Sequence, residues 1–180
     1  MSWKAIFELP EAVVSAVDLE ATYPTPEERM RAAIRLARAN IAQGGGPFGA
    51  AVFDASTGKL VAPGANRVVP GHASIAHAEM MALREAAKHL GNYRLVDCTL
   101  YVTIEPCTMC TGAMVHARIK QLVYGARESK SGAIESNAQL LDAHFFNHKI
   151  DWLGGVLSEE CSALMSQFFK RRRDQVRKSK

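Results

Sequence analysis

The chain has 180 residues, of which 48% are hydrophobic and 22% are charged, and its formal net charge is +4. This length predicts one domain, and this composition is typical of a globular protein. No apolar stretch reaches the roughly 20 residues of a transmembrane helix, and the N-terminus lacks the basic start and long apolar block of a secretion signal. We therefore expect a cytoplasmic protein without a membrane segment.

The first firm helix is predicted to begin after Thr25. Thr25 suits an N-cap, Pro26 suits the first helical position, and the two glutamates that follow suit the positive end of the helix. Apolar residues then recur at helical spacing until "QGGGP" ends the helix. Residues 1–24 precede it, and we expect them to form an N-terminal extension, either an extra helix or a loose arm.

The rest of the chain mixes strand and helix patterns. In chain order these are strands at 48–53 and 60–62, a helix around 76–90, a strand at 97–104, a helix at 107–117, strands at 121–126 and 150–153, and a last helix capped by Ser158. After residue 97 strands and helices alternate, which predicts parallel strands covered by helices on both faces. The expected fold is therefore a three-layer α/β/α domain.

The positive charge is concentrated at the C-terminus. The last eleven residues, "KRRRDQVRKSK", hold seven of the 22 basic residues and one of the 18 acidic ones, so residues 1–169 carry 15 minus 17, or −2. A basic cluster suits a polyanion such as nucleic acid. Basic residues also stabilise a solvated helix end without binding anything, so charge alone leaves both interpretations open.

The stretch "EPCTMC", Glu105 to Cys110, places two thiols three residues apart. Pro106 suits the entry to a helix, so Cys107 and Cys110 are expected on one face of a helix N-terminus. The partial positive charge there favours thiolates, the form that binds metals. Because thioredoxin-like dithiols also lie at helix starts, the two cysteines alone fit a redox pair, a structural zinc site or a catalytic metal site.

The upstream motif "AHAE" favours the catalytic site. Zinc accepts one imidazole and two thiolates readily and keeps a fourth position for water. Glu79 lies two residues from His77 and so points away from it around the helix, which suits a base beside the metal better than a ligand. H-x-E followed by P-C-x-x-C is the signature of zinc deaminases. A closed structural site would need a fourth ligand, for which Cys98 is the near candidate.

Residues 26–175 resemble the cytidine-deaminase-like superfamily of zinc deaminases. The run "NYRLVDCTLYVTIEPCTMCTGAMVHARIKQLVYGARESKSGA" is similar to bacterial tRNA wobble-adenosine deaminases nearly residue by residue, and "EECSALMSQFFKRRR" resembles their C-terminal helix. By contrast, "GGGPFGAAVF" and "NRVVPG" resemble free guanine deaminases, and Ser74-Ile75 stands where wobble deaminases usually have Pro-Thr. The resemblance implies a central mixed five-stranded sheet, bound Zn²⁺ and a homodimer.

The resemblance also implies residue roles. His77, Cys107 and Cys110 would hold Zn²⁺, and Glu79 would transfer protons to the ring nitrogen and the leaving amine. The base would be bound by Asn66, Phe48 and the backbone at Ala78, although Phe48 could equally be a core residue. Contacts to nucleic acid would come from Glu128, Lys130, Phe168, Phe169 and Arg171.

We therefore expect a zinc-dependent purine deaminase that converts adenosine to inosine at the tRNA wobble position, where an exposed anticodon loop offers a splayed base. The alternative is a deaminase of free guanine or a related nucleobase or nucleoside. A more remote alternative is a non-enzymatic zinc-binding module. In domain terms, residues 1–24 would be the extension and residues 25–180 the deaminase domain, ending in the basic helix.

Overall fold

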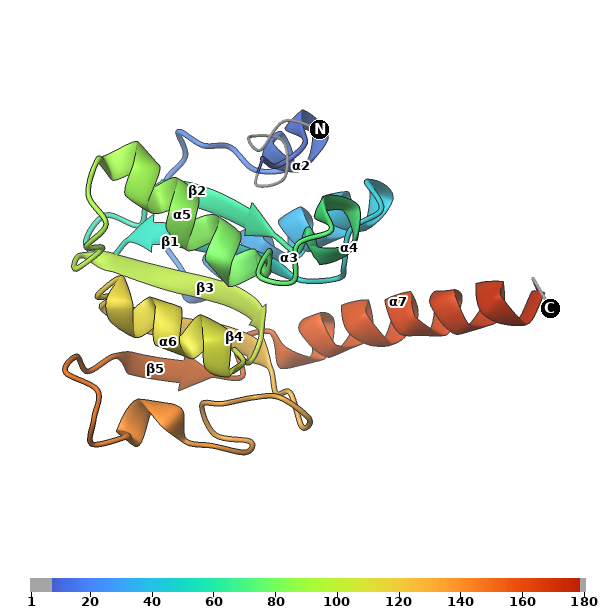
Figure 1. Cartoon of the computed structure of the whole chain (residues 1–180). Coiled ribbons are helices and arrows are strands. Elements are labelled where there is room, and N and C mark those ends of the chain that lie inside the picture. The colour runs from blue at the N-terminus through green and yellow to red at the C-terminus, as the bar shows by residue number, and fades with distance from the viewer. Residues whose placement is uncertain (1–7, 179–180) are drawn as a thin grey trace.

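The computed structural model describes residues 8–178, in which a five-stranded sheet lies between two layers of helices (Figure 1). The strands are β1 (Gly49–Asp54), β2 (Leu60–Ala65), β3 (Cys98–Ile104), β4 (Gln121–Ala126) and β5 (Asp151–Gly154). The helices are α2 (Glu11–Val14), α3 (Pro26–Ala42), α4 (Val68–Gly71), α5 (Ala78–Leu90), α6 (Thr108–His116) and α7 (Ser158–Lys178), with a 3₁₀ turn η1 (Leu140–Asp142). The predicted three-layer α/β/α fold is confirmed.

The strand order is β2-β1-β3-β4-β5. β1 runs antiparallel to both β2 and β3, whereas β3, β4 and β5 are parallel to one another. A tight turn joins β1 to β2 as a hairpin, while α6 provides the crossover that a parallel β3–β4 pair needs. The sheet is therefore mixed, and the parallel half is the half in which the sequence alternates between strands and helices.

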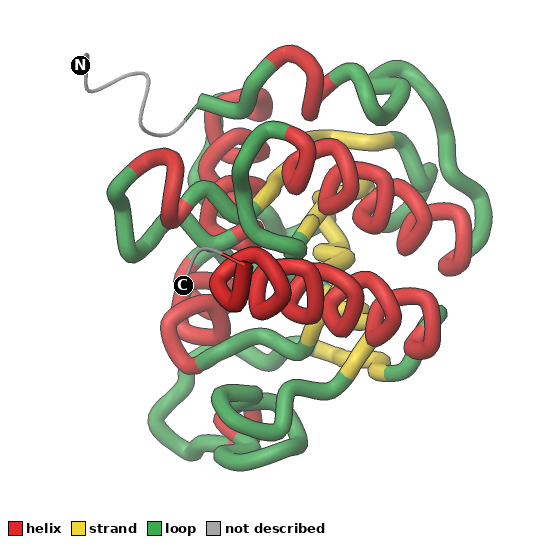
Figure 2. Tube along the Cα trace, turned by 90° about the vertical axis from the view of Figure 1, so that its right-hand side faces the viewer, coloured by secondary structure: helices red, strands yellow, loops and turns green. Residues whose placement is uncertain are grey.

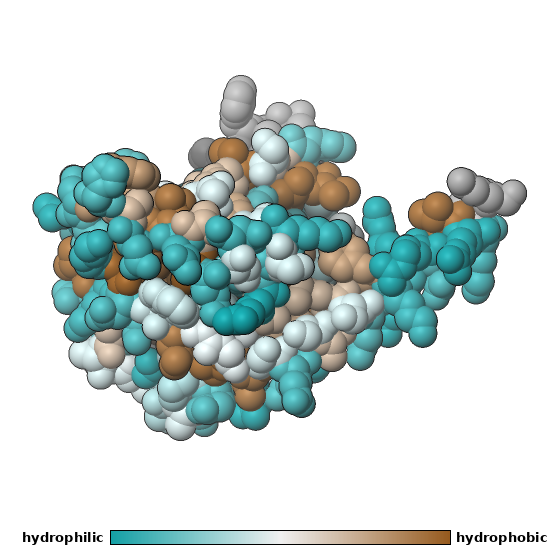
Figure 3. Space-filling view, turned by 90° about the horizontal axis from the view of Figure 1, so that it is seen from below, coloured by the Kyte–Doolittle hydropathy of each residue, from teal (hydrophilic) through white to brown (hydrophobic). Residues whose placement is uncertain are grey.

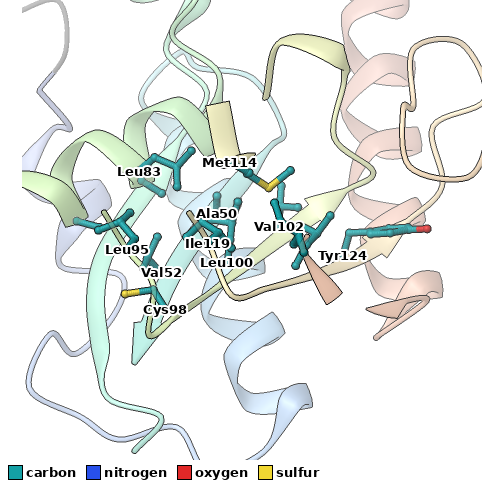
Figure 4. Packing of buried hydrophobic residues seen from close by; sticks show 14 of the residues in the cluster. Ala50, Val52, Leu83, Leu95, Cys98, Leu100, Val102, Met114, Ile119 and Tyr124 are labelled. Atoms are coloured by element: carbon teal, nitrogen blue, oxygen red, sulfur yellow. The ribbon is translucent and has the colours of Figure 1, made fainter. Parts of the chain in front are cut away.

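Helices bury both faces of the sheet over β1 to β4, whereas three of the four residues of β5 are exposed. α5 and α6 cover one face, and α3 with the start of α7 covers the other (Figures 1 and 2). Successive residues of a strand point their side chains alternately toward the two helical layers. Val52 and Val102 pack toward α5 and α6 (Figure 4), whereas Phe53 and Tyr101 pack toward α3. All seven residues of β3 are buried, as expected for a strand covered on both sides.

Two glycines let helices lie directly on the sheet. A Cβ added at Gly49 would overlap the carbonyl oxygen of Ala33 in α3. A Cβ added at Gly64 would overlap the carbonyl oxygen of Ala78 at the start of α5. Because α5 begins within the motif "AHAE", the second contact fixes the distance between this helix N-terminus and the sheet.

Substituting Gly64→Ala is expected to lower the free energy of unfolding by about 1–3 kcal/mol, the usual cost of overpacking a core. The added methyl group meets helix backbone, which cannot move aside as a flexible side chain would. Chemical denaturation of the variant and the parent checks this. Equal midpoints and equal slopes would show that α5 can shift outward without cost.

The N-terminal region described by the structure belongs to the body of the domain. Val13 and Val17 are buried in the α3-side core, and Thr22 forms an isolated bridge with Lys59 next to β2. The extra helix considered for this region is the four-residue α2. The remainder of the predicted extension, residues 1–7, lies outside the described residues.

The start of α3 is capped as predicted. The Thr25 hydroxyl accepts a hydrogen bond from the backbone N–H of Glu28, and the Glu28 carboxylate accepts one from the backbone N–H of Thr25. This reciprocal capping box satisfies two N–H groups that would otherwise have no partner. It fixes the entry to the helix that supports the back of the sheet.

The β1–β2 turn is held by one carboxylate. Asp54 Oδ1 accepts hydrogen bonds from the hydroxyl and the backbone N–H of Ser56 and from the backbone N–H and the hydroxyl of Thr57. The Ser56 hydroxyl contributes most, and together these donors lower the pKa of Asp54 from 3.8 to about 2.

This shift predicts a pH dependence of stability. A lowered folded-state pKa stabilises the protein above pH 3.8, and the contribution is lost as the pH falls toward 2. Between pH 5 and 2, the free energy of unfolding should therefore fall more steeply with decreasing pH for the parent than for Asp54→Asn. Identical pH profiles for the two proteins would contradict the assignment, because all other titrating groups are common to both.

α7 packs on the body only through its first half. Cys161 and Leu164 are buried and Phe168 is half-buried, whereas every residue from Phe169 to Lys178 is exposed. At 1.5 Å per residue, this exposed part reaches about 15 Å beyond Phe168. It stands out from the body as a largely hydrophilic arm (Figure 3). Within residues 8–178, no helix has the length and apolar character needed to cross a membrane.

Candidate active site

The site lies where the N-termini of α5 and α6 meet. His77 is the N-cap residue of α5, Cys107 is the N-cap residue of α6, and Cys110 lies in the first turn of α6. Neither N-cap side chain caps its own helix. Instead, His77 Nδ1 lies 3.7 Å from Cys107 Sγ and 3.5 Å from Cys110 Sγ, and the two sulfurs are 3.7 Å apart.

These distances fit a tetrahedral zinc ion. With Zn–S bonds of about 2.3 Å and a Zn–N bond of about 2.0–2.1 Å, tetrahedral angles place the sulfurs about 3.8 Å apart and each sulfur about 3.5 Å from the nitrogen. Among the described residues, His77, Cys107 and Cys110 are the one group of three or more potential ligands that converges in this way. Three ligands and one open position are typical of a catalytic zinc site.

The closed structural site considered for Cys98 is excluded by the fold. Cys98 begins β3 and Cys107 follows its end, so the full length of a seven-residue strand, about 20 Å, separates them. Cys98 is instead buried in the core on the α5 and α6 side (Figure 4). All four cysteines are free.

The two thiols are electrostatically coupled. The hydrogen bond between Cys107 and Cys110 and the neighbouring imidazole of His77 lower the pKa of Cys107 to about 4, against the opposing effect of burial. The same hydrogen bond, reinforced by burial, raises the pKa of Cys110. Metals bind cysteine as the thiolate, so a divalent cation would displace the thiol protons on binding.

Glu79 shares a cavity with these ligands. It is the second residue of α5, its exposed fraction is 4%, and burial raises its pKa. The cavity has a volume of about 150 Å³, much more than the roughly 10–15 Å³ that one water needs. It is lined by Phe48, Asn66, His77, Glu79, Ile104, Glu105, Cys107, Glu128 and Ser131.

Two of the three residues predicted to bind the base, Phe48 and Asn66, line this cavity. Phe48 also packs partly against the core, so both roles considered for it are compatible with its position. Ala78 is fully buried in the core and is not among the lining residues, and a contact from its backbone stays a prediction.

The residue that holds Asn66 in place was not predicted from the sequence. Asn40 is fully buried in α3, and its amide nitrogen donates to the carbonyl oxygens of Gly46 (2.9 Å) and Asn66 (2.8 Å). Arg67 in turn donates to the side-chain oxygen of Asn40 at 3.1 Å. A polar residue on the apolar stripe of a helix was the available signal, because buried amides are retained only where they are hydrogen-bonded.

A second, more open hollow of about 480 Å³ adjoins the cavity and shares Phe48, Asn66 and His77 with it. Phe168 and Phe169, both predicted to contact nucleic acid, line its far wall. Their neighbour in this wall is Arg172, one position after the predicted Arg171. The hollow also includes the glycine-rich segment 44–46 and residues of α4.

The remaining predicted contacts are spread around the site. Glu128 lines the small cavity, and its carboxylate accepts a hydrogen bond from the backbone N–H of Lys130 at 2.8 Å. Lys130 and Arg171 are exposed and lie outside both linings. Glu105, for which the sequence predicted no role, lines the small cavity as well.

Comparison with known proteins gives consistent relatives. A family model described as the cytidine and deoxycytidylate deaminase zinc-binding region matches residues 24–126. A tRNA-specific adenosine deaminase from Haemophilus influenzae is 46% identical over 149 residues, covering 83% of this chain and 86% of that protein. One from Bacillus subtilis is 41% identical over 141 residues, covering 78% of this chain and 86% of that protein.

Solved structures include both kinds of relative. A guanine deaminase from Nitrosomonas europaea superposes with a TM-score of 0.78 at 36% identity, covering 90% of this chain and 94% of that one. A structure from a study of A-to-I editing by tRNA:A34 deaminases superposes with a TM-score of 0.71 at 36% identity, covering 76% and 97%. Together with the geometry of His77, Glu79, Cys107 and Cys110, these matches show that the chain belongs to the zinc-binding cytidine and deoxycytidylate deaminase family.

Proposed function

We propose that this protein hydrolytically deaminates a purine base presented by a tRNA anticodon loop, converting adenosine to inosine at the wobble position. His77, Cys107 and Cys110 would hold the zinc ion. When bound, zinc lowers the pKa of a coordinated water toward 7 and so makes it a nucleophile at neutral pH. Overall, a C–O bond forms, the C–N bond to the amino group breaks and ammonia leaves.

The protein's own residues would carry the proton transfers and the binding. Glu79, buried in the cavity wall, would accept a proton and deliver it first to the ring nitrogen and then to the departing amine. Asn66 would hydrogen-bond the base and fix its orientation, and Phe48 would pack against the ring. A base that fills the small cavity would displace bulk water from it, which strengthens these interactions.

The observation that carries this proposal is that the small cavity adjoins the larger hollow, which residues of α7 also line. A free base needs only a pocket of its own size, whereas a base within a tRNA brings its neighbouring nucleotides along. Phe168 and Phe169 offer aromatic faces on which flanking bases can stack, and Arg172 offers a phosphate contact. The exposed basic end of α7 extends this surface.

A specific observation also favours deamination of free guanine. The carboxylate-bearing residue Glu128 lines the small cavity. Guanine presents N–H donors on its pairing edge that a carboxylate can accept, whereas the ring nitrogens on the corresponding edge of adenine are acceptors. The guanine deaminase from Nitrosomonas europaea is similar over more of this chain than the tRNA:A34 deaminase is.

The two functions are separated by one assay. The purified protein is incubated with a tRNA that carries a wobble adenosine and, separately, with free guanine, and ammonia release is measured in both. We expect turnover with the tRNA and inosine at the wobble position. Turnover of guanine together with an unchanged tRNA would assign the second function, and no turnover of either would contradict both.

We also propose that residues 25–180 form the deaminase domain, preceded by the extension 1–24, and that the chain is a homodimer. The outer face of α6 supports the dimer because this helix carries no Lys, Arg, Asp or Glu, and a helix without a polar face is usually covered. A Cβ added at Gly112 would meet no neighbouring atom within 4 Å in residues 8–178. Gly112→Arg should therefore give a monomer in sedimentation velocity, and an unchanged oligomeric state would rule out this face.

A further inference from the structure

Glu105 is a carboxylate that one loop surrounds. It follows the last residue of β3, and its exposed fraction is only 2%. One carboxylate oxygen accepts backbone N–H groups from Ile134 (3.0 Å), Glu135 (2.8 Å) and Ser136 (2.9 Å). The other accepts the backbone N–H of Glu128 at 3.1 Å and the hydroxyl of Ser136.

All five donors come from the loop between β4 and η1, residues 127–139, which we call the β4–η1 loop. The loop closes tightly on the carboxylate, because a Cβ added at Gly132 would overlap the Glu105 carboxylate. A further bond joins the same two segments, from the N–H of Ala133 to the carbonyl oxygen of Pro106 at 2.8 Å. The loop is therefore wrapped around a single buried charge.

This arrangement uses the acceptor capacity of Glu105 in full. An ionised carboxylate offers about four lone-pair sites, and here five donors converge on it. Glu105 lines the small cavity but has no lone pair left for a substrate. Glu128 and Ser131, which the same loop carries, also line the cavity, where their side chains can meet a substrate.

We propose that Glu105 is a positioning residue that anchors the β4–η1 loop and so builds the substrate-binding wall of the cavity from Glu128 and Ser131. The inference rests on the proposed deaminase function, because the wall has a role only if the cavity takes a base. It assigns Glu105 neither to the metal nor to proton transfer. Its loss should affect substrate binding and leave the metal site intact.

The test variant is Glu105→Gln. An amide keeps one carbonyl acceptor but presents an NH₂ group where the second carboxylate oxygen accepts, so the N–H of Glu128 loses its partner. We expect the amides of Glu128 and of residues 134–136 to exchange hydrogen much faster, with α5 and α6 unchanged. We further expect KM to rise at least about tenfold, with kcat changed by less than about threefold, the pattern of lost ground-state binding. Zinc content should stay at the parent level.

Ser136→Ala is the milder companion. It removes one donor and should raise KM by a smaller factor in the parent but not further in Glu105→Gln, because both variants act on one contact. It also keeps the test decisive if Glu105→Gln does not fold.

The outcomes separate this inference from the proposed function. Unchanged exchange of the β4–η1 loop amides in Glu105→Gln would overturn the inference, as would faster exchange with an unchanged KM. A parent protein that deaminates neither tRNA nor guanine would overturn the proposed function. In that case loop exchange would still decide whether Glu105 anchors the wall.

Discussion

Replacing Glu79 by glutamine is expected to lower kcat for deamination by between about 100-fold and 10,000-fold, the usual contribution of a positioned acid–base group. Glutamine keeps the size of the side chain but cannot accept and release a proton. Because Glu79 is two residues from His77 and lies outside the converging ligand group, zinc content should not change. Single-turnover assays with metal analysis of the same preparation check both parts.

Glu85→Gln is the matched control for this experiment. Glu85 lies six residues further along α5, where it pairs at the surface with Arg84 and Lys88. The same chemical change there should leave kcat unaltered. A Glu79→Gln protein with full activity would show that proton transfer uses another group, and one without zinc would show that Glu79 holds the metal.

Ending the chain after Phe169 is expected to reduce kcat/KM for a tRNA substrate by at least about tenfold and to flatten its salt dependence. The removed segment carries seven basic residues and one acidic residue. Each phosphate contact to a single strand contributes about 0.7 to the slope of log affinity against log salt concentration. Zinc content should be that of the full chain, because the buried contacts of α7 end with Leu164. Initial rates at several salt concentrations measure the effect.

Because truncation both removes charge and shortens α7, a second variant should change the charge alone. Converting Arg171, Arg172 and Arg173 to glutamine keeps α7 intact and should reproduce most of the loss. Converting Lys59 and Lys88, which form surface ion pairs away from the site, should not. Full tRNA activity in the truncated protein would instead favour the interpretation of this segment as a solvated helix end.

The positions of the main elements followed from the sequence because their signals are local. The Thr25 capping box, the apolar run of β3 and the alternation after residue 97 each reflect physics that acts over a few residues. β2 continues three residues beyond its predicted end at residue 62, since Pro63 and Gly64 read as a strand end. The edge position of β2 permits a proline, and α5 packs against Gly64.

The short elements α4 and η1 were not predicted. Each is only one turn long, so neither has an apolar repeat that sequence reading could detect.

The candidate zinc ligands were also predictable from local signals, because each lies in a short motif at the start of a helix. The supporting residues were not. Asn40 reaches Asn66 across 26 residues, and Glu105 reaches the β4–η1 loop across 23 to 31 residues. Such contacts depend on how β1, β3 and β4 are ordered in the sheet, which no local pattern contains. The lining role of Arg172 likewise depends on how α7 is rotated on the body.

The central claim is that His77, Cys107 and Cys110 hold a catalytic zinc ion. X-ray absorption at the zinc edge of the purified protein tests this claim most directly. The account predicts one zinc per chain, with two sulfur neighbours at about 2.3 Å and nitrogen or oxygen neighbours at about 2.0–2.1 Å. Replacing Cys107 or Cys110 by serine should remove one of the two sulfurs or the metal itself. Protein without zinc, or zinc surrounded by four sulfurs, would contradict the account.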